Sequence, residues 1–141
     1  MRHPLLIALF TVALAPFAAA QTDGGDPLQF AEKMPVWSTC ISEADETASM
    51  NCTTQAIAEF VMQRVSYPKK MRKQQVAGTV IARFVVEKDG SIGDVEVVRG
   101  IDPQLDDQVV DAVRAFPAFQ PGEQLGKPVR VQYALPVRFS L

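Results

Sequence analysis

The chain has 141 residues, a formal net charge of −2 at pH 7, one histidine and two cysteines. The slight acidic excess argues against a nucleic-acid binder, which would normally carry a basic excess. The length suits one domain with a small core.

Residues 1–20 have the pattern of a secretory signal. A positively charged start is followed by an apolar stretch over 5–15 and by small residues ending at Ala20. We expect cleavage after Ala20 and a soluble, exported product. An uncleaved inner-membrane anchor is the alternative, but the apolar run is short for a span of about 20 residues and is interrupted by Pro16.

Residues 21–33 contain two glycines, Pro27 and scattered acids, which predicts a flexible lead-in. The folded domain is expected to span 34–141. Its first residues, Met34-Pro35-Val36-Trp37, are apolar enough to dock against another part of the protein.

Cys40 and Cys52 are an even pair in an exported chain, which is most simply a disulfide. The loop that it closes is short, and in the chain-entropy model such a loop contributes roughly 3 kcal/mol to stability. A redox or metal role would need a Cys-x-x-Cys spacing or further ligands, and the sequence has neither.

A first helix is predicted after Thr53 or Thr54, either of which could cap it. Apolar residues then recur at helical spacing until Tyr67-Pro68 ends the helix. Pro68 can start a short second turn that carries a basic cluster, Lys69, Lys70, Arg72 and Lys73. We interpret this cluster as a solvated face, with an anionic membrane surface or an acidic partner as the alternatives.

Two strands are predicted over 78–86 and 92–98, because both segments are rich in β-branched residues and Asp89-Gly90 between them is a strong hairpin signal. Asp102-Pro103 then provides a cap and a first-turn proline for a second helix. One face of this helix is apolar: Leu105, Val109, Ala112, Val113 and Phe116. Pro117 ends the helix, and a turn-rich connection follows up to Pro128.

The last predicted strand runs from Val129 to Leu141, where apolar residues alternate with the others without interruption. Pro136 lacks an N–H and therefore predicts an edge strand with that position facing outward. Since N–H and C=O directions alternate along a strand, the backbone groups of Arg130, Gln132 and Ala134 would also face outward, free to pair with an added strand. The alternative is an ordinary edge protected from aggregation by its arginines and proline.

The element order helix, strand, strand, helix, strand predicts an α+β domain. We expect a small three-stranded antiparallel sheet in the order 2-1-3, with both helices packed on one face. This order leaves the last strand on an edge.

No catalytic constellation is evident, and we predict that the protein is not an enzyme. The only histidine, His3, lies in the expected signal, so sites that depend on histidine are excluded from the mature chain. Asp106 and Asp107 are adjacent on a predicted helix and point in different directions. The sequence gives no sign of a cofactor or of a metal site.

Several motifs together resemble the TonB C-terminal domain, in the version common in Bacteroidota-type bacteria. They follow the order of that family over about 34–141: Tyr67-Pro68, Gly78-Thr79-Val80, Asp89-Gly90-Ser91-Ile92, Val97-Val98-Arg99-Gly100, Phe119-Gln120-Pro121-Gly122, Gly126-Lys127-Pro128-Val129 and Leu135-Pro136-Val137-Arg138-Phe139. Each motif alone is weak, but their order is specific.

The resemblance implies a periplasmic module that captures the N-terminal box peptide of TonB-dependent outer-membrane transporters by adding it as a strand. In the family, the inner-membrane proteins ExbB and ExbD use the proton gradient to exert force on the transporter through the captured peptide. Carried onto this chain, the partner-binding residues are Val129, Arg130, Val131, Gln132, Tyr133, Ala134 and Leu135, supported by Arg64, Val65 and Ser66.

The sequence departs from a complete transducer, because we see neither an uncleaved anchor nor a long Pro-rich spacer. Residues 21–36 would extend to only roughly 55 Å. The alternatives to an energised role are a soluble accessory, a competitor for transporter boxes, or a subunit working with an anchored partner linked to ExbB and ExbD. A structural envelope module that binds peptidoglycan or another envelope protein is the main alternative, and pairing of exposed edges into a homodimer is also open.

Overall fold

The computed structural model describes residues 25–41 and 44–140. The expected signal and its cleavage point lie outside these residues, as does Leu141. The elements are a short 3-10 helix η1 (Ser38–Cys40), helices α1 (Glu46–Arg64), α2 (Lys69–Lys73) and α3 (Pro103–Arg114), and strands β1 (Gly78–Val86), β2 (Ile92–Arg99), β3 (Gly122–Gln124), β4 (Lys127–Val129) and β5 (Val131–Phe139).

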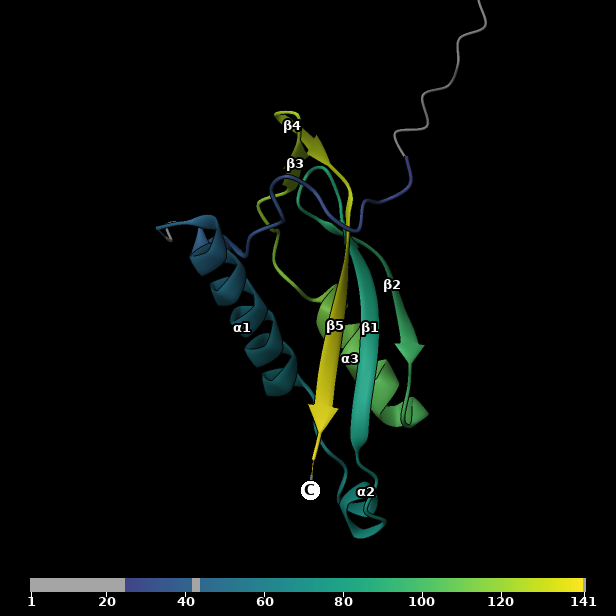
Figure 1. Ribbon diagram of the computed structural model, residues 1–141. Helices are drawn as coiled ribbons and strands as arrows, with labels where there is room; N and C mark the ends of the chain where they lie inside the picture. Colours follow the sequence, from purple (N-terminus) through teal and green to yellow (C-terminus); the bar gives the residue numbers. More distant parts are fainter. Residues whose placement is uncertain (1–24, 42–43, 141) are drawn as a thin grey trace, which may run out of the picture.

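The main sheet is antiparallel and has the strand order β2-β1-β5. Helices α1 and α3 cover one of its faces, with α3 behind the strands and α1 beside β5 (Figure 1). Strand β5 pairs with β1 over its whole length, from Val131 opposite Val86 to Phe139 opposite Gly78. The predicted α+β class and the order 2-1-3 are confirmed, and β5 is an edge strand.

The predicted hairpin between β1 and β2 is present. Gly90 has a φ of 85°, a conformation that glycine adopts without strain. The carboxylate of Asp89 accepts hydrogen bonds from the backbone N–H and the hydroxyl of Ser91, and these bonds lower the pKa of Asp89. The turn is therefore stabilised by the residues that predicted it.

Helix α3 also follows the prediction. The Asp102 side chain accepts a hydrogen bond from the Gln104 N–H, and Pro103 is the first helical residue. The predicted apolar residues of this helix are all buried, including Phe116 just beyond its end. Their burial against the sheet provides most of the driving force for this part of the fold.

The predicted start of α1 was wrong by about two turns. The helix begins at Glu46, and the Asp45 side chain caps it by accepting from the Ala48 N–H at 2.8 Å. Thr53 lies inside the helix, where its buried hydroxyl oxygen accepts a hydrogen bond from the Trp37 N–H. Thr53 thus has the polar side chain of a cap but uses it to hold the preceding segment.

The predicted last strand is two strands. Val129 belongs to β4, which pairs with β3 in a small hairpin turned at Leu125 and Gly126, both with positive φ. Strand β5 begins only at Val131. Alternation of side chains continues through Arg130 and so could not show that the backbone changes partner there.

An aromatic cluster forms the upper core. Trp37 makes edge-to-face contacts with Phe60, Phe116 and Phe119, with ring centroids 5.4–5.6 Å apart. Phe84 of β1 joins the cluster through Phe116. The apolar segment that begins at Met34 is therefore part of the domain. A disulfide joins Cys40 of η1 to Cys52 of α1, as predicted.

Candidate functional site: the free edge of β5

The outward direction of the β5 backbone is fixed by two hydrogen bonds beyond the sheet. The Gln132 N–H donates to the Leu28 carbonyl at 2.8 Å, and the Arg130 carbonyl accepts from the Leu28 N–H at 3.0 Å. Directions alternate along a strand, so Ala134, Pro136 and Arg138 face the same way as Gln132. Pro136 therefore sits where a missing N–H costs no bond to β1.

The same two bonds correct one expectation. The outward groups of Arg130 and Gln132 were expected to be free, but Leu28 forms a parallel β-bridge with Val131 and occupies one group from each. The sequence pattern could not show this contact, because a single bridge leaves no periodicity. Within the described residues, the outward groups of β5 that lack a backbone partner begin at the Gln132 carbonyl and continue along Ala134 and Pro136.

The residues that lead into the domain are held at several further points. Lys33 exchanges two backbone hydrogen bonds with Glu123 of β3, and Val36 exchanges two with Gln120. We call Gly25–Phe30, which lies along the start of β5, the edge segment. Its downstream neighbours are thus fixed to the β3–β4 hairpin.

Arg130 links the edge segment to the sheet. Its guanidinium donates to both carboxylate oxygens of Glu87, at 2.7 and 3.2 Å, and to the Gly25 carbonyl at 2.9 Å. The hydrogen bonds to Glu87 raise the pKa of Arg130 above its usual value. The side chains of Arg130 and Glu87 are only 17% and 28% exposed, so solvent screens this pair less than an ordinary surface pair.

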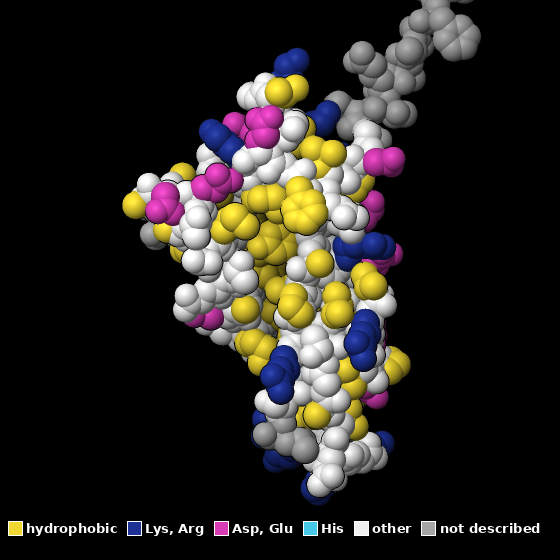
Figure 2. All heavy atoms as spheres, viewed as in Figure 1, with side chains coloured by type: hydrophobic (Ala, Val, Ile, Leu, Met, Phe, Trp, Pro, Cys, Tyr) yellow, Lys and Arg dark blue, Asp and Glu magenta, His cyan; other side chains and the backbone are white. Residues whose placement is uncertain are grey.

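An apolar groove of about 550 Å³ runs along the open part of the β5 edge. Figure 2 shows hydrophobic side chains gathered in a hollow between α1 and β5. The residues around it come from the lead-in, α1, the sheet and β5: Gln29, Phe30, Met34, Thr54, Ile57, Ile81, Arg83, Val98, Gln132, Tyr133, Ala134, Leu135 and Pro136. The groove therefore places apolar side chains beside unpaired backbone groups.

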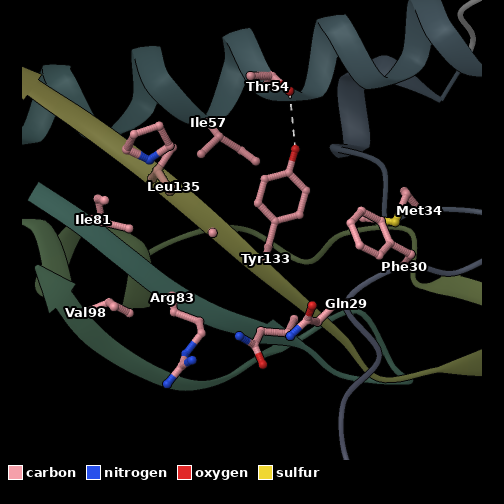
Figure 3. A pocket seen from close by; sticks show the side chains of 13 residues that line it. Gln29, Phe30, Met34, Thr54, Ile57, Ile81, Arg83, Val98, Tyr133 and Leu135 are labelled. Atoms are coloured by element: carbon pink, nitrogen blue, oxygen red, sulfur yellow. Dashed lines mark hydrogen bonds between the residues drawn. The ribbon is translucent and has the colours of Figure 1, made fainter. Parts of the chain in front are cut away.

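Tyr133 connects the two walls of the groove. Its ring stacks on Phe84, and its hydroxyl points to Thr54 of α1, with 3.3 Å between the oxygens (Figure 3). The Thr54 hydroxyl hydrogen is already donated to the Met50 carbonyl. Tyr133 is therefore the donor to Thr54, and this bond helps hold α1 at its distance from β5.

Phe30 forms part of the groove on the side of the lead-in (Figure 3) and is 84% exposed. Single exposed apolar side chains are common on protein surfaces. Contiguous exposed apolar patches are rare and often mark interaction sites. The prediction of a flexible lead-in over 21–33 gave no reason to assign Phe30 to the site, and Met34 was expected only to dock against another part of the protein. Their apolar character was the only available signal.

The ten predicted binding residues do not form one surface. Residues 132–135 line the groove, whereas Val129 lies in β4 and Val131 is fully buried. Arg64, Val65 and Ser66 do not line the groove. Both backbone groups of Ser66 bond the Gln108 side chain of α3, and Arg64 stacks over the Phe60 ring at 4.3 Å. Thr54 and Ile57 are the α1 residues beside the β5 edge.

The basic cluster forms α2. Its four Lys and Arg side chains are exposed, while Met71 between them is buried. Arg72 lies over the ring of Tyr67, with 5.4 Å to the centroid. The cluster lies near the C-terminal end of β5, away from the β3–β4 hairpin (Figure 1).

Residues 25–41 and 44–140 contain no group of three His, Cys, Asp or Glu side chains that could hold a metal ion. In the same part of the chain, no helix has the length and apolar character needed to cross a bilayer.

Comparison with known proteins gives one family. Residues 63–141, more than half of the chain, match the family described as "Gram-negative bacterial TonB protein C-terminal". No curated protein sequence matches the chain.

Similar solved structures include two solution structures of the Helicobacter pylori TonB-CTD. One is 23% identical and aligns over 61% of this chain and 90% of that chain; the other is 21% identical and aligns over 67% and 82%, and both have a TM-score of 0.48. The Pseudomonas aeruginosa TonB CTD is 26% identical over 54% of this chain and 77% of that chain, with a TM-score of 0.43.

Proposed function

The chain belongs to the TonB C-terminal family of Gram-negative bacteria, and on this premise we propose that it captures an extended peptide by strand addition at the β5 edge. The peptide is the N-terminal box of TonB-dependent outer-membrane transporters. The protein acts in the periplasm and supports energised uptake, either directly or through an anchored partner linked to ExbB and ExbD.

The observation that carries the proposal is the open stretch of β5 beside an apolar groove. Ala134 presents both its N–H and its C=O outward, with the Gln132 and Pro136 carbonyls on either side. An added strand would gain main-chain hydrogen bonds at these atoms and place alternate side chains in the groove. Backbone bonds supply affinity that depends little on sequence, and the groove adds a preference for apolar side chains.

The expected affinity is modest. A few backbone hydrogen bonds contribute about 0.5–1.5 kcal/mol each after the loss of bonds to water. The costs of association and of ordering the peptide reduce the sum, which leaves binding in roughly the micromolar range. Weak binding suits a partner that must be released after each transport event.

The proposal is tested by titrating the protein with synthetic peptides from the periplasmic N-termini of the host's transporters. Ala134→Pro removes the outward N–H without removing a bond to β1, so we expect at least about a fivefold loss of affinity from one missing hydrogen bond and the added ring. Ala134→Val keeps the N–H and is the matched control. Equal affinity of the Ala134→Pro variant and the wild type would contradict strand addition.

The exposed basic cluster of α2 supports a second candidate, a structural module that binds peptidoglycan or another acidic envelope component. This function predicts binding that depends on charge and not on the β5 edge. Lys69→Glu combined with Lys70→Glu should abolish such binding, while Ala134→Pro should leave it intact. A peptide titration with the opposite pattern would favour the edge.

A further inference from the structure

The edge segment occupies the start of the β5 edge in the manner of an added strand. Leu28 runs parallel to β5 and bonds the outward C=O of Arg130 and the outward N–H of Gln132. On the β5 edge, these atoms are followed by the outward backbone groups of Ala134, which have no backbone partner within the described residues. A strand added along the whole edge would therefore need atoms that Leu28 already uses.

The edge segment is held weakly compared with the residues that follow it. Its backbone contributes one isolated bridge at Leu28 and one bond from the Arg130 side chain to the Gly25 carbonyl. Leu28 is 37% exposed. By contrast, Lys33 and Val36 each exchange two backbone bonds with the β3–β4 region, and Pro35 is fully buried. Detachment of residues 25–30 alone would break none of the hydrogen bonds that hold Glu32, Lys33 and Val36.

Detachment leaves the remaining structure of the edge in place. The Arg130 guanidinium keeps its two bonds to Glu87 when the Gly25 carbonyl leaves. Leu28 and Gly25 can bond water once released, whereas the Trp37 core and the Lys33 bridge do not change. The closed and open arrangements therefore differ by only a few hydrogen bonds, which is the range in which a partner can shift a population.

We propose that the edge segment Gly25–Phe30 is an internal competitor for the β5 edge. This inference rests on the proposed function of that edge. In the closed arrangement the segment limits a partner peptide to the stretch from Ala134 onward. A peptide that also pairs with Arg130 and Gln132 displaces Leu28, and its apparent affinity is reduced by the fraction of closed molecules.

The first test uses a probe of known sequence, a synthetic peptide with the sequence of residues 25–34. In the Leu28→Pro variant the bridge loses its N–H donor and the edge is vacated. We expect the peptide to bind this variant at least about fivefold more tightly than the wild type, because a closed edge lowers the apparent affinity. Amide shifts at Gln132 in an NMR titration locate the contact.

The matched control is Ala31→Pro, which introduces the same residue at a position just beyond the edge segment and outside the groove, whose N–H makes no hydrogen bond within the described residues. It should behave as the wild type does. Faster amide hydrogen exchange at Gln132 in the Leu28→Pro variant, but not in the control, is the second expected result. Equal peptide affinity in all three proteins, or unchanged exchange at Gln132, would overturn the competitor.

Transporter peptides separate this inference from the proposed function. If they bind the wild type and Leu28→Pro equally, strand addition stands and the competitor is refuted. If transporter peptides bind neither protein while the 25–34 peptide binds Leu28→Pro, the inference that the edge segment is a competitor is supported. The proposal that transporter peptides are the partner is then refuted. Tighter binding of both kinds of peptide to Leu28→Pro supports both the proposed function and the competitor.

Discussion

At the scale of single residues, Arg130 and Tyr133 set the geometry of the site. Arg130 ties the start of β5 to Glu87 and to the Gly25 carbonyl. Tyr133 is held between the Phe84 ring and the Thr54 hydroxyl oxygen. Neither role was visible in the sequence, because both depend on residues more than 40 positions away in the chain.

The pair of Glu87 and Arg130 should contribute measurably to stability. Glu87→Gln removes the charge from a partly buried, two-point contact, and we expect a loss of about 1 kcal/mol in the free energy of unfolding. Glu96→Gln is the matched control, because Glu96 pairs with Arg83 at a site where both side chains are more exposed, 56% and 43%. Its cost should stay below about 0.5 kcal/mol. Urea denaturation measures the loss of unfolding free energy in both variants. Equal losses would contradict a larger contribution from the pair of Glu87 and Arg130.

Gly90 should tolerate substitution poorly. An added Cβ would overlap the Phe119 carbonyl oxygen, and the φ of 85° strains any L residue. We expect Gly90→Ala to lower the free energy of unfolding by about 2 kcal/mol or more. Gly126→Ala has a similar φ of 74° but open space around its Cβ, so only the backbone cost of about 1 kcal/mol applies. A Gly90 cost no larger than the Gly126 cost in thermal or urea unfolding would refute the close approach.

At the scale of elements, local signals predicted some boundaries and missed others. The Asp89-Gly90 turn and the Asp102-Pro103 start of α3 depend on residues next to each other, and both are present. The start of α1 was missed because Thr53 has the side chain of a cap. Only the tertiary structure shows that Thr53 accepts from the Trp37 N–H and that Asp45 caps the helix. The β3–β4 hairpin was missed because its strands are three residues long.

The disulfide should stabilise the junction of η1 and α1. Cys40 is fully buried in the core cluster and is joined to Cys52, 12 residues later in the chain. We expect the double variant Cys40→Ala with Cys52→Ala to lose about 2–4 kcal/mol in the free energy of unfolding. Chemical reduction of the wild type provides the control, since it should lower stability by a similar amount without changing the side-chain volume. An unchanged urea midpoint after reduction would contradict this role.

At the scale of the whole molecule, the site combines a sheet edge with a segment from the other end of the chain. Pro136 was enough to predict the edge and the direction of its backbone, and the bonds of Leu28 agree with that direction. The groove was not predictable, because its walls come from α1, β1, β2 and the lead-in, which the fold alone brings together. Nothing in the sequence indicated that the edge segment occupies the start of the edge, where it bonds Arg130 and Gln132.

The most direct test of strand addition is amide hydrogen exchange at Ala134, measured by NMR with and without a saturating transporter peptide. The account predicts slower exchange at Ala134 on binding, because its outward N–H becomes a donor to the peptide, while the Leu135 N–H, already directed to β1, changes little. Unchanged exchange at Ala134, with peptide-induced shifts concentrated on Lys69–Lys73, would contradict the account and assign binding to the basic helix.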